Sequence, residues 1–289
     1  VTYLLDGASV TESAYVSGYS SATTRQLKIV VAASAPTLYY YCHYHSGMGG
    51  QANTNSTLGS SNFDGSRQAT TKVNATAGFS IVTSTSGGSS SGSYDSFGHG
   101  LGVAPNVIIL KNRDIADRWY VFNSNLSSAN NKRLALNEST AENTTSNLWG
   151  TSLPSSTTFS IDQGGYSSGT GQKIVAYCLS EVAGYSKFGK YTGNGSSDNT
   201  FVFTGFRPAW VMAKEFTGTG GNWFILDNKR SSFNVLNDIL DANLSNAERN
   251  NNEFDFLSNG FKVRLAYGSS QSFLYLAFAE APFRNARAR

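Results

Sequence analysis

The C-terminal two thirds of the sequence repeat themselves, and this constrains the fold more than any other feature. The motif Gly-Val-Ala-Pro at 102–105 matches Gly-Phe-Arg-Pro at 205–208, an offset of 208 − 105 = 103 residues. Each motif precedes an apolar run that ends in a lysine, Lys111 in the first copy and Lys214 in the second. Matching motifs at a fixed offset indicate two copies of one structural unit.

Further matches follow downstream in the same order and include two of the four tryptophans. The pairs are Trp119 with Trp223 (223 − 119 = 104), Asn137 with Asn243 and Glu142 with Glu248 (243 − 137 = 106), 159–161 with 261–263 (261 − 159 = 102), and 174–177 with 275–278 (275 − 174 = 101). Insertions in surface loops produce a drift of this size.

Within each copy, short apolar runs rich in Val, Ile, Phe, Tyr and Trp alternate with Gly, Ser and Asn clusters, a pattern that predicts strands joined by turns. The runs include 79–82, 106–111, 118–122, 201–203 and 273–279. Many short strands in about 100 residues predict a two-sheet sandwich or jelly-roll-like unit. A short helix is also compatible with 233–247.

We therefore predict an all-β chain. Its predicted parts are a cupredoxin-like β unit at 1–50, either complete or truncated, a polar linker at 51–77, a first β-sandwich repeat at 78–183 and a second at 184–289. The chain begins at Val1 rather than Met, which is compatible with a processed product or a fragment.

Charge and hydropathy exclude some partners. The chain has 22 basic and 19 acidic residues, a net charge of +3 that is spread along the sequence. The sequence therefore predicts no basic patch of the kind that binds nucleic acid or an anionic membrane. No apolar run is long enough to span a bilayer, so we expect no membrane insertion.

One segment has metal-like spacing. Cys42, His45 and Met48 form Cys-x2-His-x2-Met after a tyrosine-rich strand, which resembles the ligand loop of the cupredoxins. A thiolate and an imidazole bind copper in a trigonal plane, and a methionine sulfur adds a weak axial contact. A complete site needs a second imidazole, and 1–41 contain no histidine. Either an upstream histidine completes a copper site, or Cys42 and Met48 are apolar packing residues.

No nucleophile elbow, phosphate-binding loop or metalloprotease helix occurs in the sequence, so we expect no enzyme and no certain cofactor. Trp119 and Trp223 are candidate ligand-binding residues, because an aromatic ring can stack on the apolar face of a sugar. The alternative is that both are core residues of their strands.

Four segments carry a resemblance that covers nearly the whole chain. They are Tyr-Tyr-Tyr-Cys with His-Ser-Gly-Met-Gly-Gly at 39–50, the run at 185–195, Thr-Gly-Phe-Arg-Pro-Ala-Trp-Val at 204–211 and Phe-Leu-Ser-Asn-Gly-Phe-Lys at 256–262. Together they resemble tail-fibre-like virion structural proteins of marine bacteriophages. The resemblance implies a virion-surface component that assembles with copies of itself and has no enzyme activity.

Three hypotheses remain open from the sequence. The first is an extracellular, self-assembling phage fibre or virion-surface protein, a homo-oligomer that acts as an adhesin for host-surface glycan. The second is a structural filament without a ligand. The third is a copper-binding cupredoxin-like protein with appended sandwich domains.

Overall fold

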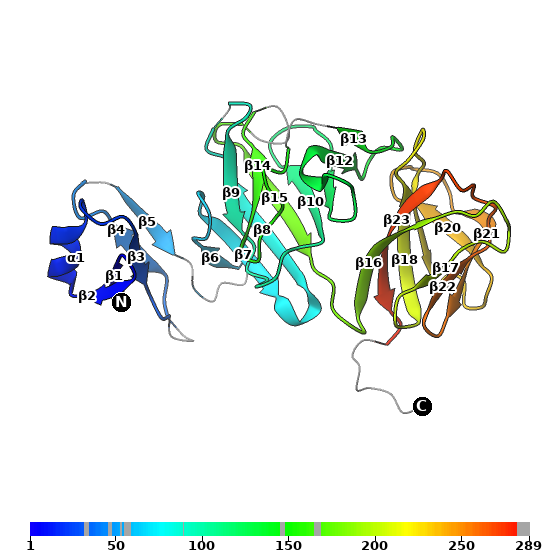
Figure 1. Cartoon of the computed structure of the whole chain (residues 1–289), viewed down its shortest axis with the longest axis horizontal. Helices are drawn as coiled ribbons and strands as arrows, with labels where there is room; N and C mark the ends of the chain where they lie inside the picture. The colour runs from blue at the N-terminus through cyan, green and yellow to red at the C-terminus, as the bar shows by residue number, and fades with distance from the viewer. Residues whose placement is uncertain are drawn as a thin grey trace. The chain divides into compact units, whose positions relative to one another are not determined.

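Two compact units, Val1–Ser60 and Ser61–Arg289, make up the chain (Figure 1). The structure is a computed structural model that describes residues 1–31, 35–45, 48–52, 54, 59–88, 90–144, 148–164 and 169–281.

The first unit is small and β-rich. An antiparallel sheet of order β2-β1-β3 is followed by the hairpin β4-β5, and the helix α1 lies between β2 and β3 in the chain. Thr11 caps α1, because its hydroxyl accepts a hydrogen bond from the Ala14 amide at 3.2 Å. The elements are β1 (Thr2–Leu5), β2 (Ala8–Val10), α1 (Glu12–Gly18), β3 (Arg25–Lys28), β4 (Leu38–Tyr41) and β5 (Gly49–Ala52).

An eight-stranded sheet of order β13-β12-β11-β10-β15-β8-β7-β6 and a two-stranded sheet β14-β9 follow. Phe97 of β9 and Phe159 of β14 share one core with Val82 of β8. The elements are β6 (Ser60–Asn62), β7 (Ala69–Asn74), η1 (Ala75–Ala77), β8 (Phe79–Thr85), β9 (Tyr94–Gly98), β10 (Val107–Asn112), β11 (Tyr120–Asn123), η2 (Ala129–Asn131), β12 (Lys132–Ala135), β13 (Asn143–Thr144), β14 (Thr158–Asp162) and β15 (Lys173–Leu179).

The last part of the chain forms a second eight-stranded sheet of order β16-β23-β18-β19-β20-β21-β22-β17. Its inner side chains, among them Val211, Leu226 and Phe261, make a core of their own. The strands are β16 (Ser186–Thr192), β17 (Phe201–Phe203), β18 (Pro208–Glu215), β19 (Trp223–Asp227), β20 (Leu236–Asp241), β21 (Arg249–Leu257), β22 (Gly260–Val263) and β23 (Ser272–Ala279).

The two sheets share the order of six strands, and they differ in that β7 and β6 extend the first sheet while β22 and β17 extend the second. The order β8-β15-β10-β11-β12-β13 of the first corresponds, strand for strand, to β16-β23-β18-β19-β20-β21 of the second, and the pair β14-β9 corresponds to β22-β17. We name β8 to β15 the first repeat and β16 to β23 the second repeat. The prediction of an all-β, sandwich-type fold is confirmed.

Two local predictions are wrong. The sequence predicts a linker at 51–77, but this segment contributes β6 and β7, and β7 pairs with β8 along its whole length. The cause is alternation, since Ala69 and Thr71 point into the core while Thr70 points away from it. The helix considered at 233–247 is instead the strand β20, which pairs with β19 and β21.

The repeats share a core. One cluster of buried side chains joins Leu126 and Leu134 of the first repeat to Phe188, Trp223 and Leu274 of the second. Because apolar burial is the dominant stabilising contribution in folding, we expect the two repeats to unfold together.

Candidate ligand-binding site

The site lies on the outer face of the first repeat's sheet, the face that points away from its core. Side chains alternate across a strand, so on β15 the residues Ile174 and Ala176 are fully buried while Lys173, Val175 and Tyr177 lie on the outer face. The second repeat has the equivalent outer face, but there it is covered by other residues.

In the second repeat this face is closed. Lys214, Trp223, Leu274 and Leu276 are 0, 2, 0 and 5% exposed. The Lys214 ammonium donates hydrogen bonds to the carbonyl oxygens of Ser139 at 2.8 Å, Thr140 at 2.9 Å and Gly221 at 2.5 Å. Burial lowers the pKa of Lys214 to about 8.

Trp223 closes the same junction. Its indole Nε1 donates to the carbonyl oxygen of Ala135 at 2.9 Å. The acceptors from 135 to 140 belong to the first repeat, so the first repeat covers the outer face of the second.

The equivalent side chains of the first repeat are partly exposed. Strand register places Lys111 beside Val175, as it places Lys214 beside Leu274. We name Lys111, Trp119, Val175 and Tyr177 the open patch. Within it the Lys111 ammonium donates to the Ile115 carbonyl oxygen at 3.0 Å. The rings of Trp119 and Tyr177 stack with their centroids 6.4 Å apart and their planes at 22°.

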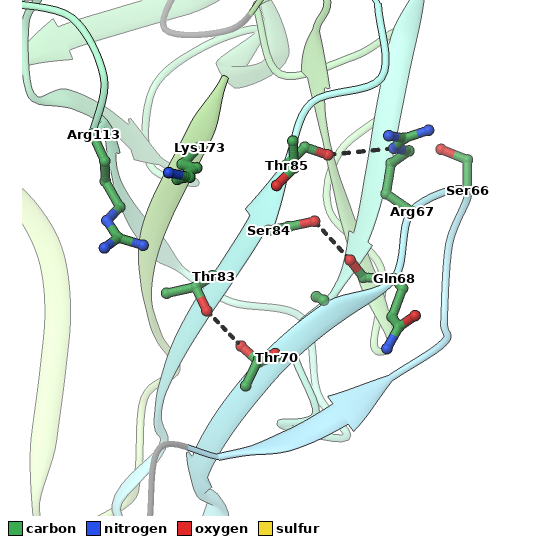
Figure 2. A pocket seen from close by; sticks show the side chains of 10 residues that line it. Ser66, Arg67, Gln68, Thr70, Thr83, Ser84, Thr85, Arg113 and Lys173 are labelled. Atoms are coloured by element: carbon green, nitrogen blue, oxygen red, sulfur yellow. Dashed lines mark hydrogen bonds between the residues drawn. The ribbon is translucent and has the colours of Figure 1, made fainter. Parts of the chain in front are cut away.

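A polar groove adjoins the open patch on the same face, because Val175 of the patch pairs with Thr83 of the groove. The groove has a volume of about 540 Å³. Figure 2 shows its side chains rising from β7, β8 and β15 and from the segments that precede β7 and follow β10. Its lining consists of Ser66, Arg67, Gln68, Ala69, Thr70, Thr83, Ser84, Thr85, Arg113 and Lys173.

Hydrogen bonds hold part of this lining in place. The Ser84 hydroxyl donates to the Gln68 carbonyl oxygen at 2.7 Å, and the Thr83 hydroxyl donates to the Thr70 carbonyl oxygen at 3.4 Å (Figure 2). Paired strands carry these side chains, so the groove has a rigid floor with hydroxyl groups on it. Hydroxyl groups both donate and accept, which suits a polyhydroxylated ligand.

The groove is cationic. Arg67, Arg113 and Lys173 line it, and its lining contains no carboxylate. The Arg67 Nε atom lies 3.4 Å from the Thr85 carbonyl oxygen and 3.9 Å from Asp95. The Arg113 and Lys173 side chains have no hydrogen-bond or ion-pair partner within the ranges that the structure describes.

The predicted metal ligands are only partly brought together. Cys42 Sγ lies 3.3 Å from His45 Nδ1. The hydrogen bond between the two side chains lowers the pKa of the Cys42 thiol. The Cys42 amide donates to the Met48 carbonyl oxygen at 2.7 Å and closes the loop, but the Met48 side chain is 57% exposed.

This donor set does not fit copper. The ring of His43 packs edge-on against Tyr44, 5.0 Å between centroids. Among the described residues no group of three or more His, Cys, Asp or Glu side chains is placed to hold a metal ion. A thiolate and one imidazole leave the trigonal plane of such a site incomplete.

The two predicted ligand-binding tryptophans differ. Trp223 is 2% exposed and belongs to the shared core, so no ring face is left for a sugar, and its proposed binding role is corrected. Trp119 keeps a partly exposed ring in the open patch. Sequence reasoning missed Arg67, Arg113 and Lys173, because they come from separate segments that only the strand pairing brings together.

Comparison with known proteins places the chain in a family. Residues 52–282 match the family described as a domain of unknown function (DUF7483). The match covers most of the chain, which therefore belongs to this family. No curated protein and no solved structure matches the chain. Over the residues described, no helix is long and apolar enough to cross a membrane.

Proposed function

We propose that this member of the DUF7483 family is a structural protein of the virion surface or tail fibre that attaches to host-surface glycan through the outer face of its first repeat. The observation that carries the proposal is the difference between two equivalent faces. Trp223 and Lys214 are buried against the first repeat, whereas Trp119 and Lys111 are left partly exposed. The duplication thus leaves one face available for a ligand.

The chemistry of this face suits a carbohydrate. The stacked rings of Trp119 and Tyr177 offer an aromatic surface to the apolar face of a sugar. The adjoining groove supplies hydroxyl groups and cationic donors for the polar face. Both lie on paired strands, which keep their spacing fixed.

Self-assembly is the second part of the proposal. Among the described residues of Val1–Ser60, Ala22 is the one buried hydrophobic side chain, and a row of tyrosines, Tyr39, Tyr40 and Tyr41, is 64, 43 and 78% exposed. An exposed apolar surface of this kind favours association. Sedimentation equilibrium of the full chain tests this part. We expect a discrete oligomer or fibre, and a monomer at every concentration would contradict it.

Binding to immobilised bacterial surface polysaccharides tests the attachment function. We expect the wild-type chain to bind and Trp119→Ala to lose at least about fivefold in affinity, because the stacking of a nucleic-acid base on an aromatic side chain is worth about 1–3 kcal/mol and we expect a similar contribution for a sugar. Phe233→Ala is the matched control, since Phe233 is 84% exposed in the second repeat. Equal binding by both variants, or no binding by the wild type, would favour the filament without a ligand.

A further inference from the structure

We infer that the glycan bound by the groove is anionic and carries sulfate ester or carboxylate groups along its chain. The inference rests on the proposed function and names the class of its ligand. Three cationic side chains, Arg67, Arg113 and Lys173, stand around a floor of threonine and serine hydroxyls. A neutral sugar would use the hydroxyl groups, but it would not need the positive charges of Arg113 and Lys173.

One nearby carboxylate neutralises part of the groove, because Asp95 forms an ion pair with Arg67, with 3.9 Å between Arg67 Nε and Asp95 Oδ1. Asp95 is 2% exposed and accepts hydrogen bonds from the Ser86 hydroxyl, the Gly87 amide and the Gln163 side-chain amide. Asp114 accepts from the Lys173 backbone amide at 2.6 Å. Both carboxylates also hold loops, and the cationic side chains of the lining without an ion-pair partner among the described residues are Arg113 and Lys173.

The cations stand on two sides of the groove. Figure 2 shows Arg113 and Lys173 on one side and Arg67 on the other, with Thr83, Ser84 and Gln68 between them. Lys173 pairs with Thr85 on β8, and Arg67 lies on the far side of β8, just before β7. Two strand spacings separate the backbones by roughly 10 Å. This arrangement fits a chain with repeated charges better than a single small anion.

The charges are a property of the first repeat and not of the fold. The Arg113 amide donates to the Lys173 carbonyl oxygen at 2.8 Å, and the equivalent amide of Phe216 donates to the Ser272 carbonyl oxygen at 3.0 Å. Where the first repeat has Arg113 and Lys173, the second therefore has Phe216 and Ser272. Because the second repeat folds without these cations, folding does not require them.

Three polymers with one backbone test the inference on the full chain. Dextran is neutral, carboxymethyl dextran carries carboxylates, and dextran sulfate carries sulfate esters. Affinity is measured for the wild type, for the groove variant Arg113→Gln/Lys173→Gln and for the control variant Lys28→Gln/Lys229→Gln. The control removes two exposed lysines elsewhere, so both variants have the same net charge.

We expect a charged dextran to bind and neutral dextran to bind at least about tenfold more weakly, since charge-assisted hydrogen bonds are about twice as strong as neutral ones. The groove variant loses at least about tenfold in affinity and the control variant less than about twofold. Preference for dextran sulfate over carboxymethyl dextran identifies the charged group as sulfate, and the reverse as carboxylate.

Two outcomes overturn the inference. One is equal binding of neutral and charged dextran, and the other is an equal loss in both variants, which is the result for nonspecific attraction. In both cases the attachment function can still hold, because Trp119→Ala tests it separately. Absence of binding to every polysaccharide, neutral or charged, instead defeats the proposed function itself.

Discussion

Replacing Lys214 by methionine should loosen the junction between the repeats. Lys214 is fully buried, and its ammonium donates to three backbone carbonyl oxygens, two of which belong to the first repeat. Methionine has a similar length and fills the space, but it cannot donate. The carbonyl oxygens of Ser139, Thr140 and Gly221 then lose their partner while they remain next to the shared core.

The magnitude follows from two opposing effects. A fully buried carbonyl left without a donor costs about 1–3 kcal/mol. The three carbonyls affected are part-buried, so each lies toward the lower end of that range. The loss of stability is partly offset in Lys214→Met, because the wild-type chain has to take the charged ammonium out of water when it folds, which costs several kcal/mol. The lowered pKa of Lys214, about 8, reflects that cost. We expect Lys214→Met to lower the free energy of unfolding by about 2–4 kcal/mol.

Lys111→Met is the matched control. Lys111 occupies the equivalent position in the first repeat, where it is partly exposed and donates to the Ile115 carbonyl oxygen. Its replacement should cost less than about 1 kcal/mol. Urea unfolding followed by tryptophan fluorescence measures both variants, since Trp149 and Trp223 are buried in the shared core. Equal stability of the two variants would refute the role assigned to Lys214.

The pH dependence gives a second check on Lys214. Its pKa is about 8 in the folded chain and has its ordinary value of 10.5 in the unfolded chain. Between these pH values the unfolded chain binds more protons, so the stability of the wild type should rise with pH relative to Lys214→Met. A constant difference between pH 7 and 10 would contradict this.

Three other predictions concern Glu253, Trp223 and the pair Cys42 and His45. Burial raises the pKa of Glu253 from 4.5 to about 7, so the folded chain binds more protons than the unfolded chain between these pH values. Glu253→Gln should therefore leave the free energy of unfolding unchanged at pH 4 and raise it by up to about 3 kcal/mol at pH 8. An equal effect at both pH values would contradict this. Trp223→Phe should cost about 1–3 kcal/mol in urea unfolding, since the Ala135 carbonyl loses its donor, and a cost below that of Trp119→Phe would count against it. Calorimetric titration with Cu(II) should show no stoichiometric uptake at Cys42 and His45, and a visible absorption band that disappears in Cys42→Ser would overturn that expectation.

The strands of the repeats could be predicted because each strand is marked by the residues of its own short segment. Runs such as 107–110 and 273–278 are apolar and β-branched or aromatic, and glycines mark the turns between them. The register of the last strand was harder. Matching of the sequences makes residue 278 the equivalent of residue 177. The strand registers instead make Leu276 the equivalent of Tyr177, an offset of 276 − 177 = 99. Because the error is two residues, the face assigned to each side chain stays the same.

The difference between the two outer faces could not be predicted from sequence. Trp119 and Trp223 occupy equivalent positions on equivalent strands, and only contacts with a distant segment, 135–140, bury Trp223. The strand β7 was missed because its inward residues, Ala69 and Thr71, are small or polar and resemble a linker. The groove has no local pattern at all, since Arg67, Arg113 and Lys173 lie far apart in the chain.

Hydrogen–deuterium exchange of the full chain, with and without a bound surface polysaccharide, tests the central claim most directly. The claim is that the outer face of the first repeat binds a glycan while its equivalent in the second repeat serves to join the repeats. We predict slower exchange on binding at 66–70, 83–85, 111–113 and 173–177, and no change at the equivalent 190–192, 214–216 and 272–276. Protection confined to the second repeat or to Val1–Ser60 would contradict the account.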